Sequence, residues 1–389
     1  MTAPGDERVA LTPPGDVLAL LERLVAIDSV NPTLVPGGAG EREIAAFVAG
    51  WARDAGLRAD VLEGTPGRPS VVVRAQGSGG GRTLMLCGHL DTVGVAGMDA
   101  PHAPRRDGDR LHGRGAYDMK AGVAAALIAC REAATLDLAG DVVVAAVADE
   151  EHASLGIREV LRSVGADLAI VTEPTELELV VAHKGFAWLQ VDVAGRAAHG
   201  SRPHLGLDAI VKAGPVLTAL GELDARLTEH THPLLGPASV HASAIAGGGE
   251  PSSYPASCVL TLERRTLPGE TAAGVERELA ALLDACRAAD PELAATQRTL
   301  MVREPWEVAP DAELVRVVRE AAGEVLGGPP AIGGASYWAD TAFIAAAGVP
   351  TVMLGPGGEG AHAAVEWVSV ADTELVARAL VAAAARLCA

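Results

Sequence analysis

Residue types that bind metal ions or carry protons stand in this sequence directly after apolar stretches. The first such stretch runs from Leu84 to Cys87 and is followed by Gly88, His89 and Asp91. His89 and Asp91 are two residues apart, so their side chains point the same way in an extended chain. Because ligands of open α/β sheets bind beyond the carboxyl ends of the strands, we expect chemistry at this position.

The same arrangement recurs at four later points of the chain. Side chains of these types follow an irregular segment, two apolar runs and a Gly-rich loop, and they are Asp118, the acidic group Asp149-Glu150-Glu151, Glu173 and His362. Taken singly, Asp118 could cap the helix predicted over 121–134, and the three consecutive acids could form a solvated turn. Five such coincidences at the ends of five elements are improbable by chance, so we interpret them as one site.

This set of side chains suits metal ions. Two histidines and several carboxylates, without thiolates, are the ligands that a pair of zinc-like divalent ions prefers. Consecutive acids such as Glu150 and Glu151 would repel each other at a buried strand end unless a cation were present. Two metal ions about 3.5–4 Å apart lower the pKa of a bound water and provide a nucleophile at neutral pH. The sequence therefore predicts a dinuclear metal site in a hydrolase.

Seven short segments occur in order along nearly the whole chain. They include Gly-His-Leu-Asp-Thr-Val at 88–93, Gly-Arg-Gly-Ala-Tyr-Asp-Met-Lys at 113–120 and Thr-Glu-Pro-Thr at 172–175, and the others cover 149–151, 195–203, 263–270 and 360–368. In these segments the sequence resembles the dinuclear zinc peptidase and deacylase family M20. The motifs are specific for the family and its mechanism, but they do not specify the substrate.

The resemblance implies a role for each metal ligand. His89 and Glu173 would bind one ion, Glu151 and His362 would bind the other, and Asp118 would bridge the two. The cofactors would be two divalent ions, with Zn²⁺ expected and Co²⁺ or Mn²⁺ as alternatives. A hydroxide that bridges the ions would be the nucleophile.

The resemblance also implies catalytic and substrate-binding residues. Asp91 would orient the ligating imidazole of His89 without itself binding a metal ion, and Glu150 would be the general base. His199 would stabilise the oxyanion, and in dimeric members this histidine reaches the site of the partner subunit. Arg265 would bind a substrate carboxylate, a task that suits its fork of donors. The alternatives are a plain loop histidine for His199, a surface salt bridge for Arg265, and use of Arg264 in its place.

Three features depart from the family pattern. Ser252 stands three residues before Pro255, where many deacylases have an asparagine, which puts the usual substrate-side amide contact in doubt. Tyr117 is bulkier than the residue that often precedes the bridging aspartate. The segment 334–341 is expected to be a pocket wall or the start of a core helix.

Hydrophobic periodicity predicts two domains in an α/β protein. The order of elements from 184 to 303 is βαββαβ, which is that of a ferredoxin-like unit. We expect this unit to be inserted into a catalytic domain formed by 1–183 and 304–389, with a mixed sheet and helices on both faces. The Gly-rich segment 77–81 lacks the lysine and the helix start of a phosphate-binding loop, and we expect it to be a hairpin loop.

The composition excludes several classes of function. The net charge of −19 is carried without any basic region, which argues against nucleic acid as a partner. No apolar run is long enough to cross a bilayer, and residues 1–12 lack the apolar core of a signal peptide, so we expect a cytoplasmic protein that does not bind membranes. The five cysteines are scattered and include no CxxC pair, so neither a disulfide framework nor a thiolate zinc site is expected.

The sequence leaves three hypotheses for function. The first is a metal-dependent amide hydrolase that deacylates N-acyl amino acids, of the acetylornithine or succinyl-diaminopimelate type. Glu173, rather than an aspartate, favours the deacylase and carboxypeptidase branch of the family. The second is a carboxypeptidase or dipeptidase that acts on short peptides, and the third is a non-catalytic binding relative, which the presence of Glu150 disfavours. The βαββαβ unit is expected to form a homodimer.

Overall fold

The structure is a computed structural model, and it describes residues 15–389, so the N-terminal segment for which no signal peptide is expected lies outside it. The described chain forms two compact units. The first unit contains residues up to Val181, Val308–Gly333 and Ala339–Ala389, and the second contains Ala182–Glu307 and Gly334–Trp338. The predicted domain limits were 184 and 303.

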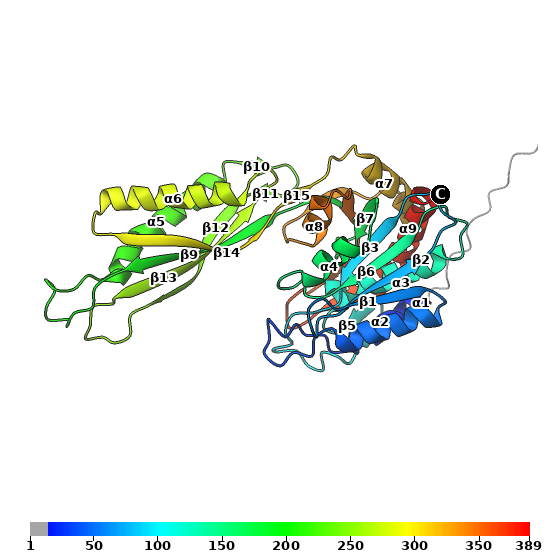
Figure 1. The fold of residues 1–389 in the computed structure, drawn as a ribbon, viewed down its shortest axis with the longest axis horizontal. Helices are drawn as coiled ribbons and strands as arrows, with labels where there is room; N and C mark the ends of the chain where they lie inside the picture. The colour runs from blue at the N-terminus through cyan, green and yellow to red at the C-terminus, as the bar shows by residue number, and fades with distance from the viewer. Residues whose placement is uncertain (1–14) are drawn as a thin grey trace, which may run out of the picture. The chain divides into compact units, whose positions relative to one another are not determined.

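Seven strands of a nine-stranded mixed sheet form the centre of the first unit (Figure 1), in the order β1-β2-β6-β3-β7-β17-β8. These strands are β1 (Arg58–Leu62), β2 (Ser70–Ala75), β3 (Leu84–His89), β6 (Val142–Val147), β7 (Leu168–Val171), β8 (Leu179–His183) and β17 (Thr351–Met353). The strands β3, β6, β7 and β17 run parallel, whereas β1, β2 and β8 pair antiparallel with their neighbours. The four parallel strands therefore end at the same edge of the sheet.

Helices cover both faces of this sheet. Every residue of β3 and β6 is buried although their side chains alternate between the two faces, so neither face is open to water. The helices of the first unit are α1 (Gly15–Val25), α2 (Arg42–Asp54), α3 (Ala121–Ala133), α4 (Leu155–Ser163), α7 (Glu313–Leu326), α8 (Thr341–Ala346) and α9 (Val370–Leu387). The small residues of α3 allow close packing, and eleven of its thirteen residues are buried.

A second, small sheet of the first unit was not predicted. Its order is β18-β19-β5-β4, with β4 (Arg105–Asp107), β5 (Arg110–His112), β18 (Gly358–Glu359) and β19 (Trp367–Ser369). The strands are two or three residues long, too short for a recognisable alternation of apolar and polar residues. They join the segment before Asp118 to the segment that carries His362.

The expectation of a hairpin at 77–81 is wrong. The flanking strands β2 and β3 are not neighbours, because β6 lies between them in the sheet. The connection instead passes close to the backbone of Gly140, and a Cβ atom at Gly77 would lie 2.4 Å from the Gly140 carbonyl oxygen. Glycine is therefore required there by a close approach of two chain segments rather than by a tight turn.

The second unit has the predicted βαββαβ order. Its antiparallel sheet, β12-β13-β9-β14, consists of β9 (Gly185–Ala194), β12 (Ser239–Gly247), β13 (Ser257–Thr266) and β14 (Ala294–Arg303). The helices α5 (Ala209–Leu227) and α6 (Ala272–Ala289) bury one face of this sheet, including Leu189 and Val191 of β9. The short pairs β10 (Thr231–His232) with β11 (Gly236–Pro237), and β15 (Trp306–Glu307) with the end of β8, complete the unit, and β16 (Ile332–Ala335) also pairs with β8.

Two expectations from composition can be compared with the structure. No helix between residues 15 and 389 is both long and apolar enough to span a membrane. All five cysteines are buried and unpaired as thiols.

Candidate metal centre

The carboxyl ends of the parallel strands bring the predicted metal-binding side chains to one edge of the main sheet. His89 is the last residue of β3, the three acids 149–151 follow β6, and Glu173 follows β7. His362 lies between β18 and β19 of the small sheet, where its φ of 62° is in the left-handed region. The sheet topology thus gathers residues that are up to 273 positions apart, from His89 to His362.

Asp118 lies between the two imidazoles. Its Oδ1 is 3.1 Å from Nε2 of His89, and its Oδ2 is 3.4 Å from Nε2 of His362. The same nitrogen of His362 is 3.1 Å from Oε2 of Glu151. Asp118 does not cap the helix after it, because α3 begins at Ala121 and no side chain caps it. Its carboxylate instead presents one oxygen to each histidine, which is the arrangement that a bridging ligand needs.

A backbone carbonyl, rather than a carboxylate, orients His89. The Nδ1 of His89 is 2.9 Å from the carbonyl oxygen of Asp91 and 3.8 Å from Oδ1 of the same residue. A proton on Nδ1 leaves Nε2 with a lone pair that faces Asp118 and Glu173. The Asp91 carboxylate has a different task, since it accepts hydrogen bonds from the backbone N–H groups of Glu150 and Glu151 at 3.1 and 3.3 Å.

Two overlapping groups of donors could each hold an ion. One comprises His89, Asp118 and Glu151, and the other comprises His89, Glu150 and Glu173, with the ligand atoms of each group within 4.8 Å of one another. Oε1 of Glu151 is buried and, within the described part of the chain, has no hydrogen-bond partner. An unpaired buried carboxylate oxygen is costly, so the donor set fits a bound cation.

The electrostatics of the centre also fit a cation. Burial, opposed by His89 and reinforced by Glu173, raises the pKa of Glu150 well above its ordinary value. Burial also raises the pKa of Glu173, with the charges of Asp118 and Glu151 adding to the effect against that of His89. Hydrogen bonds to Asp118 and Glu151 raise the pKa of His362 to about 10. The acids therefore hold protons or need positive charge between them, and divalent ions supply such charge.

A buried network of hydrogen bonds and ion pairs next to the metal centre was not predicted from the sequence. Arg68 donates to Glu41 at 2.6 Å and lies 2.8 Å from Oδ1 of Asp149. Asn31 donates to Asp149 at 3.0 Å and to Asp91 at 2.8 Å. This network holds the turn of three acids against the end of β3. Its members come from separate loops, and no spacing in the sequence marks them.

Asp340 was also missed as a single residue, although its segment was expected to be a pocket wall or the start of a core helix, and α8 does begin at Thr341. It is buried, and its negative charge contributes to the raised pKa of both Glu150 and Glu173. The segment 334–341 itself is divided, because Gly334–Trp338 belongs to the second unit.

Glu366 holds the loop that presents Asp118. Its buried carboxylate pairs with Arg114 at 2.5 Å and accepts hydrogen bonds from the backbone N–H groups of Gly115, Tyr117 and Asp118 at 3.1, 2.9 and 3.1 Å. Glu366 lies four residues after His362, so one side chain links the segments of two predicted ligands.

Glu366→Gln is expected to destabilise the protein by about 3–5 kcal/mol, because it leaves the buried charge of Arg114 without its partner. Chemical denaturation of the two proteins measures the difference in the free energy of unfolding. Asp60→Asn is the control, since Asp60 pairs with Arg58 at the surface and should contribute less than about 1 kcal/mol. Equal effects of the two substitutions would contradict the structural role of Glu366.

His199, Arg264 and Arg265, for which catalytic or substrate-binding roles were considered, all lie in the second unit. His199 is exposed, and its Nδ1 is 2.8 Å from the hydroxyl of Ser201. Arg264 is buried and pairs with Glu270 at 2.5 Å and Glu278 at 3.0 Å, which disfavours it as the substrate-binding arginine. Arg265 donates through Nε to Glu263 at 2.7 Å and is 32% exposed.

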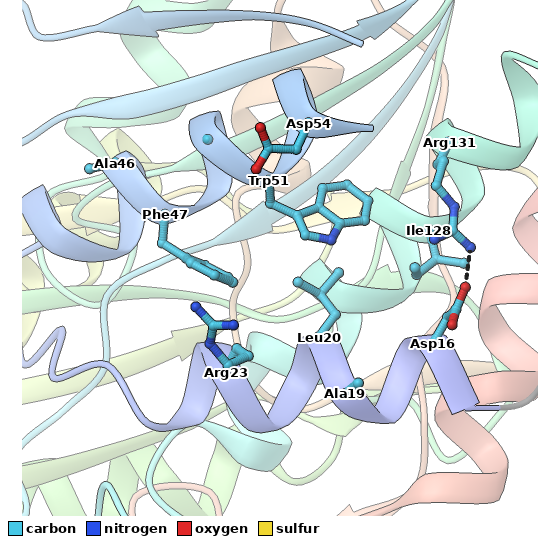
Figure 2. A pocket seen from close by; sticks show the side chains of 11 residues that line it. Asp16, Ala19, Leu20, Arg23, Ala46, Phe47, Trp51, Asp54, Ile128 and Arg131 are labelled. Atoms are coloured by element: carbon cyan, nitrogen blue, oxygen red, sulfur yellow. Dashed lines mark hydrogen bonds and ion pairs between the residues drawn. The ribbon is translucent and has the colours of Figure 1, made fainter. Parts of the chain in front are cut away.

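Figure 2 shows a groove elsewhere in the first unit, between α1, α2 and α3. It has a volume of about 460 Å³, and its walls include Trp51, the ion pair of Arg131 with Asp16 at 2.8 Å, and Arg23 stacked on Phe47. None of the residues predicted to do chemistry lines this groove. The predicted chemistry therefore does not lie there.

Comparisons with known proteins agree with the predicted family and fold. The sequence model of peptidase family M20/M25/M40 matches residues 85–386. Acetylornithine deacetylase from Myxococcus xanthus is 31% identical over 388 residues, which cover 95% of this chain and 97% of that protein.

Solved structures of low sequence identity share the fold. The aminopeptidase PepT from Bacillus cereus has a TM-score of 0.77 at 19% identity, with 95% of this chain and 98% of that chain covered. The YXEP protein from Bacillus subtilis, described as a dinuclear metal binding peptidase from M20 family, has a TM-score of 0.75 at 14% identity, with 96% and 98% covered. The predicted α/β fold with a mixed sheet is thereby confirmed.

Proposed function

Because the chain belongs to peptidase family M20/M25/M40 and is a metal-dependent hydrolase, we propose that it cleaves the amide bond of N-acyl amino acids. One observation carries the proposal: the Asp118 carboxylate lies between His89 and His362, with buried acids on either side. The similarity to an acetylornithine deacetylase over 95% of the chain favours deacylation within the family.

The proposed ligands divide into two sets that share Asp118. His89 with Glu173 would hold one ion, and Glu151 with His362 would hold the other. The set contains nitrogen and oxygen donors only, which suits Zn²⁺ and leaves Co²⁺ and Mn²⁺ as alternatives for metal analysis to distinguish. The unpaired oxygen of Glu151 and the mutual repulsion of the acids support this assignment.

Bound ions would polarise the substrate carbonyl and lower the pKa of the attacking water. Glu150 would accept the proton of that water and pass it to the leaving nitrogen. A carboxylate oxygen of Glu150 lies within 4.8 Å of ligand atoms of His89 and Glu173, which suits a base that acts next to the first ion. Asp91 would keep Glu150 in place through the hydrogen bond from the Glu150 backbone.

The proposal extends to two residues of the second unit. His199 would stabilise the oxyanion, in the same chain or across a dimer. Arg265 would bind the carboxylate of the amino acid, because its Nε is already held by Glu263 and its terminal nitrogens have no hydrogen-bond partner among residues 15–389.

A carboxypeptidase or dipeptidase is the second candidate. The fork of Arg265 would suit the C-terminal carboxylate of a short peptide equally well, so this observation does not separate the two substrates.

A paired substrate panel tests the proposed function. The metal-loaded protein is expected to release acetate or succinate from N-acyl amino acids at higher kcat/KM than it releases a C-terminal amino acid from dipeptides. Dialysis against a chelator should abolish hydrolysis, and Zn²⁺ should restore it. Activity that survives removal of the metal would contradict the mechanism, and a preference for dipeptides would favour the second candidate.

We also propose a homodimer formed through the edge of β12. This terminal strand is exposed from His241 to Gly247 and presents Ile245, which is 55% exposed. The neighbouring helix α5 adds Ile210 and Val211, at 43% and 68% exposed. Unpaired backbone groups beside apolar side chains favour pairing with another strand.

Ile245→Lys is expected to convert a dimer into a monomer, because it places a charge within the apolar edge. Sedimentation equilibrium of both proteins measures the change. Leu300→Lys is the control, since Leu300 is 44% exposed on β14, the opposite terminal strand of the same sheet. A monomeric wild-type protein, or dissociation by the control substitution alone, would argue against this interface.

A further inference from the structure

A buried arginine lies next to the turn of three acids, and its guanidinium is fully engaged. Arg68 is 8% exposed and forms a bidentate pair with Glu41, through Nε at 2.7 Å and through a terminal nitrogen at 2.6 Å. The same terminal nitrogen lies 2.8 Å from Oδ1 of Asp149, and the other donates to the hydroxyl of Thr33 at 3.0 Å. Three partners on one planar group require the fixed fork of donors that arginine provides.

The charge of Arg68 compensates acids that are withdrawn from water. Glu41, Asp91 and Asp149 are all completely buried. Although burial acts in the opposite direction, the hydrogen bond to Glu41 and the charges of the three acids raise the pKa of Arg68, so the guanidinium is charged at neutral pH. A buried carboxylate is tolerated only beside a cation or hydrogen-bond donors, so the position of these acids depends on Arg68.

Asp149 begins the turn of acids in an unusual backbone conformation. Its φ of 65° lies in the left-handed region, which is unfavourable for residues other than glycine. Contacts with its neighbours maintain this conformation, since its backbone N–H donates to Glu41 and its Oδ2 accepts from the N–H of Ala153, both at 3.2 Å. The other oxygen, Oδ1, contacts Arg68 at 2.8 Å and Asn31 at 3.0 Å. Arg68 therefore helps to hold a strained residue directly before the proposed general base.

A second path leads from Asp149 to the backbone of the two glutamates that follow it. The side-chain amide of Asn31 donates to Asp149 at 3.0 Å and to Asp91 at 2.8 Å. Asp91 in turn accepts hydrogen bonds from the N–H groups of Glu150 and Glu151. A displacement of Asp149 is thus passed on to both glutamates, along the chain and through Asp91.

The position of this turn determines which part of the metal centre each glutamate reaches. A carboxylate oxygen of Glu150 lies within 4.8 Å of ligand atoms of His89 and Glu173. Oε2 of Glu151, by contrast, is 3.1 Å from Nε2 of His362. Because the two residues are adjacent, one shift of the turn misplaces both, and a misplacement of about 1 Å can lower a rate about 100-fold.

We propose that Arg68 is a positioning residue for amide hydrolysis, which acts through Asp149 to fix the turn that carries a general base and a metal ligand. These two groups are Glu150 and Glu151, and their roles rest on the proposed function. Arg68 is buried and all its nitrogens are engaged in the network, so it does not act on the substrate itself. Its effect on the turn is measurable without catalysis.

Arg68→Lys removes the fork of donors but keeps a positive charge. Because an ammonium group does not match the three partners of the guanidinium, we expect kcat to fall about 10–100-fold. The substrate is the N-acetyl amino acid that the wild-type protein hydrolyses fastest, and KM for it should change less than about two-fold. Unchanged kinetic constants, or a raised KM at an unchanged kcat, would contradict a positioning role.

Arg68→Ala allows the missing group to be supplied from solution. Guanidinium chloride, far below the concentration that unfolds the protein, should raise kcat of this variant several-fold, whereas sodium chloride at the same concentration should not. Equal effects of the two salts would argue that the guanidinium geometry is not needed.

Arg74→Ala is the matched control for both variants. Arg74 on β2 also forms an ion pair that links β2 to β6, but its partner Asp141 directly precedes β6, whereas Asp149 follows that strand. Since this pair is partly exposed and lies at the opposite end of β6 from the acids, kcat should stay within about two-fold of the wild-type value. A loss of kcat as large as that of Arg68→Lys would contradict the specific role of Arg68.

Hydrogen–deuterium exchange of the metal-free protein tests the turn directly. The backbone N–H groups of residues 149, 150, 151 and 153 all donate to carboxylates of the network. Arg68→Lys should therefore speed exchange in this segment several-fold, and Arg74→Ala should not. Unaltered exchange in Arg68→Lys would overturn the proposal, whatever the activity.

If the Arg68 variants do not fold, Asn31→Ala keeps the proposal testable, because it interrupts the second path and leaves the ion pairs in place. It should also speed exchange in residues 149–153 and lower kcat more than it changes KM. An absence of both effects would overturn the network as a positioning device.

Titration with Zn²⁺ separates this proposal from the proposed function. If the wild-type protein hydrolyses no amide, the proposed function fails, but exchange and metal binding still test Arg68. Arg68→Lys should bind one Zn²⁺ ion about ten-fold more weakly than the wild-type protein, because Glu151 is displaced. Unchanged affinity for both ions would contradict the role of Arg68 in placing Glu151.

Discussion

Glu150→Gln is expected to lower kcat by about 10²–10⁴-fold while both metal ions remain bound. Glutamine keeps the size of the side chain and one oxygen, but it cannot accept the proton of the attacking water. The hydrogen bond from the backbone N–H of residue 150 to Asp91 does not involve the substituted group, so the turn of acids should keep its conformation. Steady-state kinetics and metal analysis by mass spectrometry are needed on the same preparation.

Two outcomes would contradict this assignment of Glu150. Full activity in the variant would show that another group takes the proton. Loss of an ion together with activity would make Glu150 a ligand, in line with its place beside His89 and Glu173. Glu159→Gln is a control, because Glu159 lies on α4, a few residues further along the same connection.

Asp118→Asn is expected to abolish activity and to weaken the binding of both ions by more than about 100-fold. Substitution of a residue that only hydrogen-bonds to a metal ligand typically lowers metal affinity by about 10–100-fold, and loss of a direct ligand should cost more. One carboxylate oxygen faces each histidine, so the substitution replaces an anionic oxygen on one side with an amide group. Glu151 also lies within 4.8 Å of His89 and 3.1 Å from His362, but among the described residues Asp118 makes the shorter pair of contacts, at 3.1 and 3.4 Å.

Calorimetric titration with Zn²⁺ measures the loss. Asp107→Asn is the control, because Asp107 is 72% exposed and pairs only loosely with Arg105, at 3.9 Å. Retention of two tightly bound ions by Asp118→Asn would contradict a bridging role. Loss of one ion alone would assign Asp118 to a single metal.

Much of the fold could be predicted because its signals are local. Apolar runs such as 84–87 are long enough to mark buried strands, and the glycines and acids after them mark where the strands end. The ferredoxin-like order of the second unit followed from alternation and helical periodicity, both properties of neighbouring residues. The histidines and acids at strand ends could be read for the same reason, since position relative to a strand is a local property.

Features that depend on which segments become neighbours were missed or mistaken. The wrong hairpin at 77–81 arose because the insertion of β6 between β2 and β3 depends on residues more than 60 positions away. The small sheet was not predicted, because strands of two or three residues owe their existence to their pairing partners. The strand β8 was also missed, although its five buried residues form an apolar run that is a local signal.

The sequence by itself determined the kinds of side chain available for chemistry and the ends of the elements that carry them. Only the tertiary structure decided that Glu366 anchors the loop of Asp118 and that Arg68 balances Glu41 and Asp149. The physical reason is that a buried charge is tolerated only beside a partner, and these partners come from distant parts of the chain. Spacing along a sequence cannot encode such pairs, because packing of the whole domain brings them together.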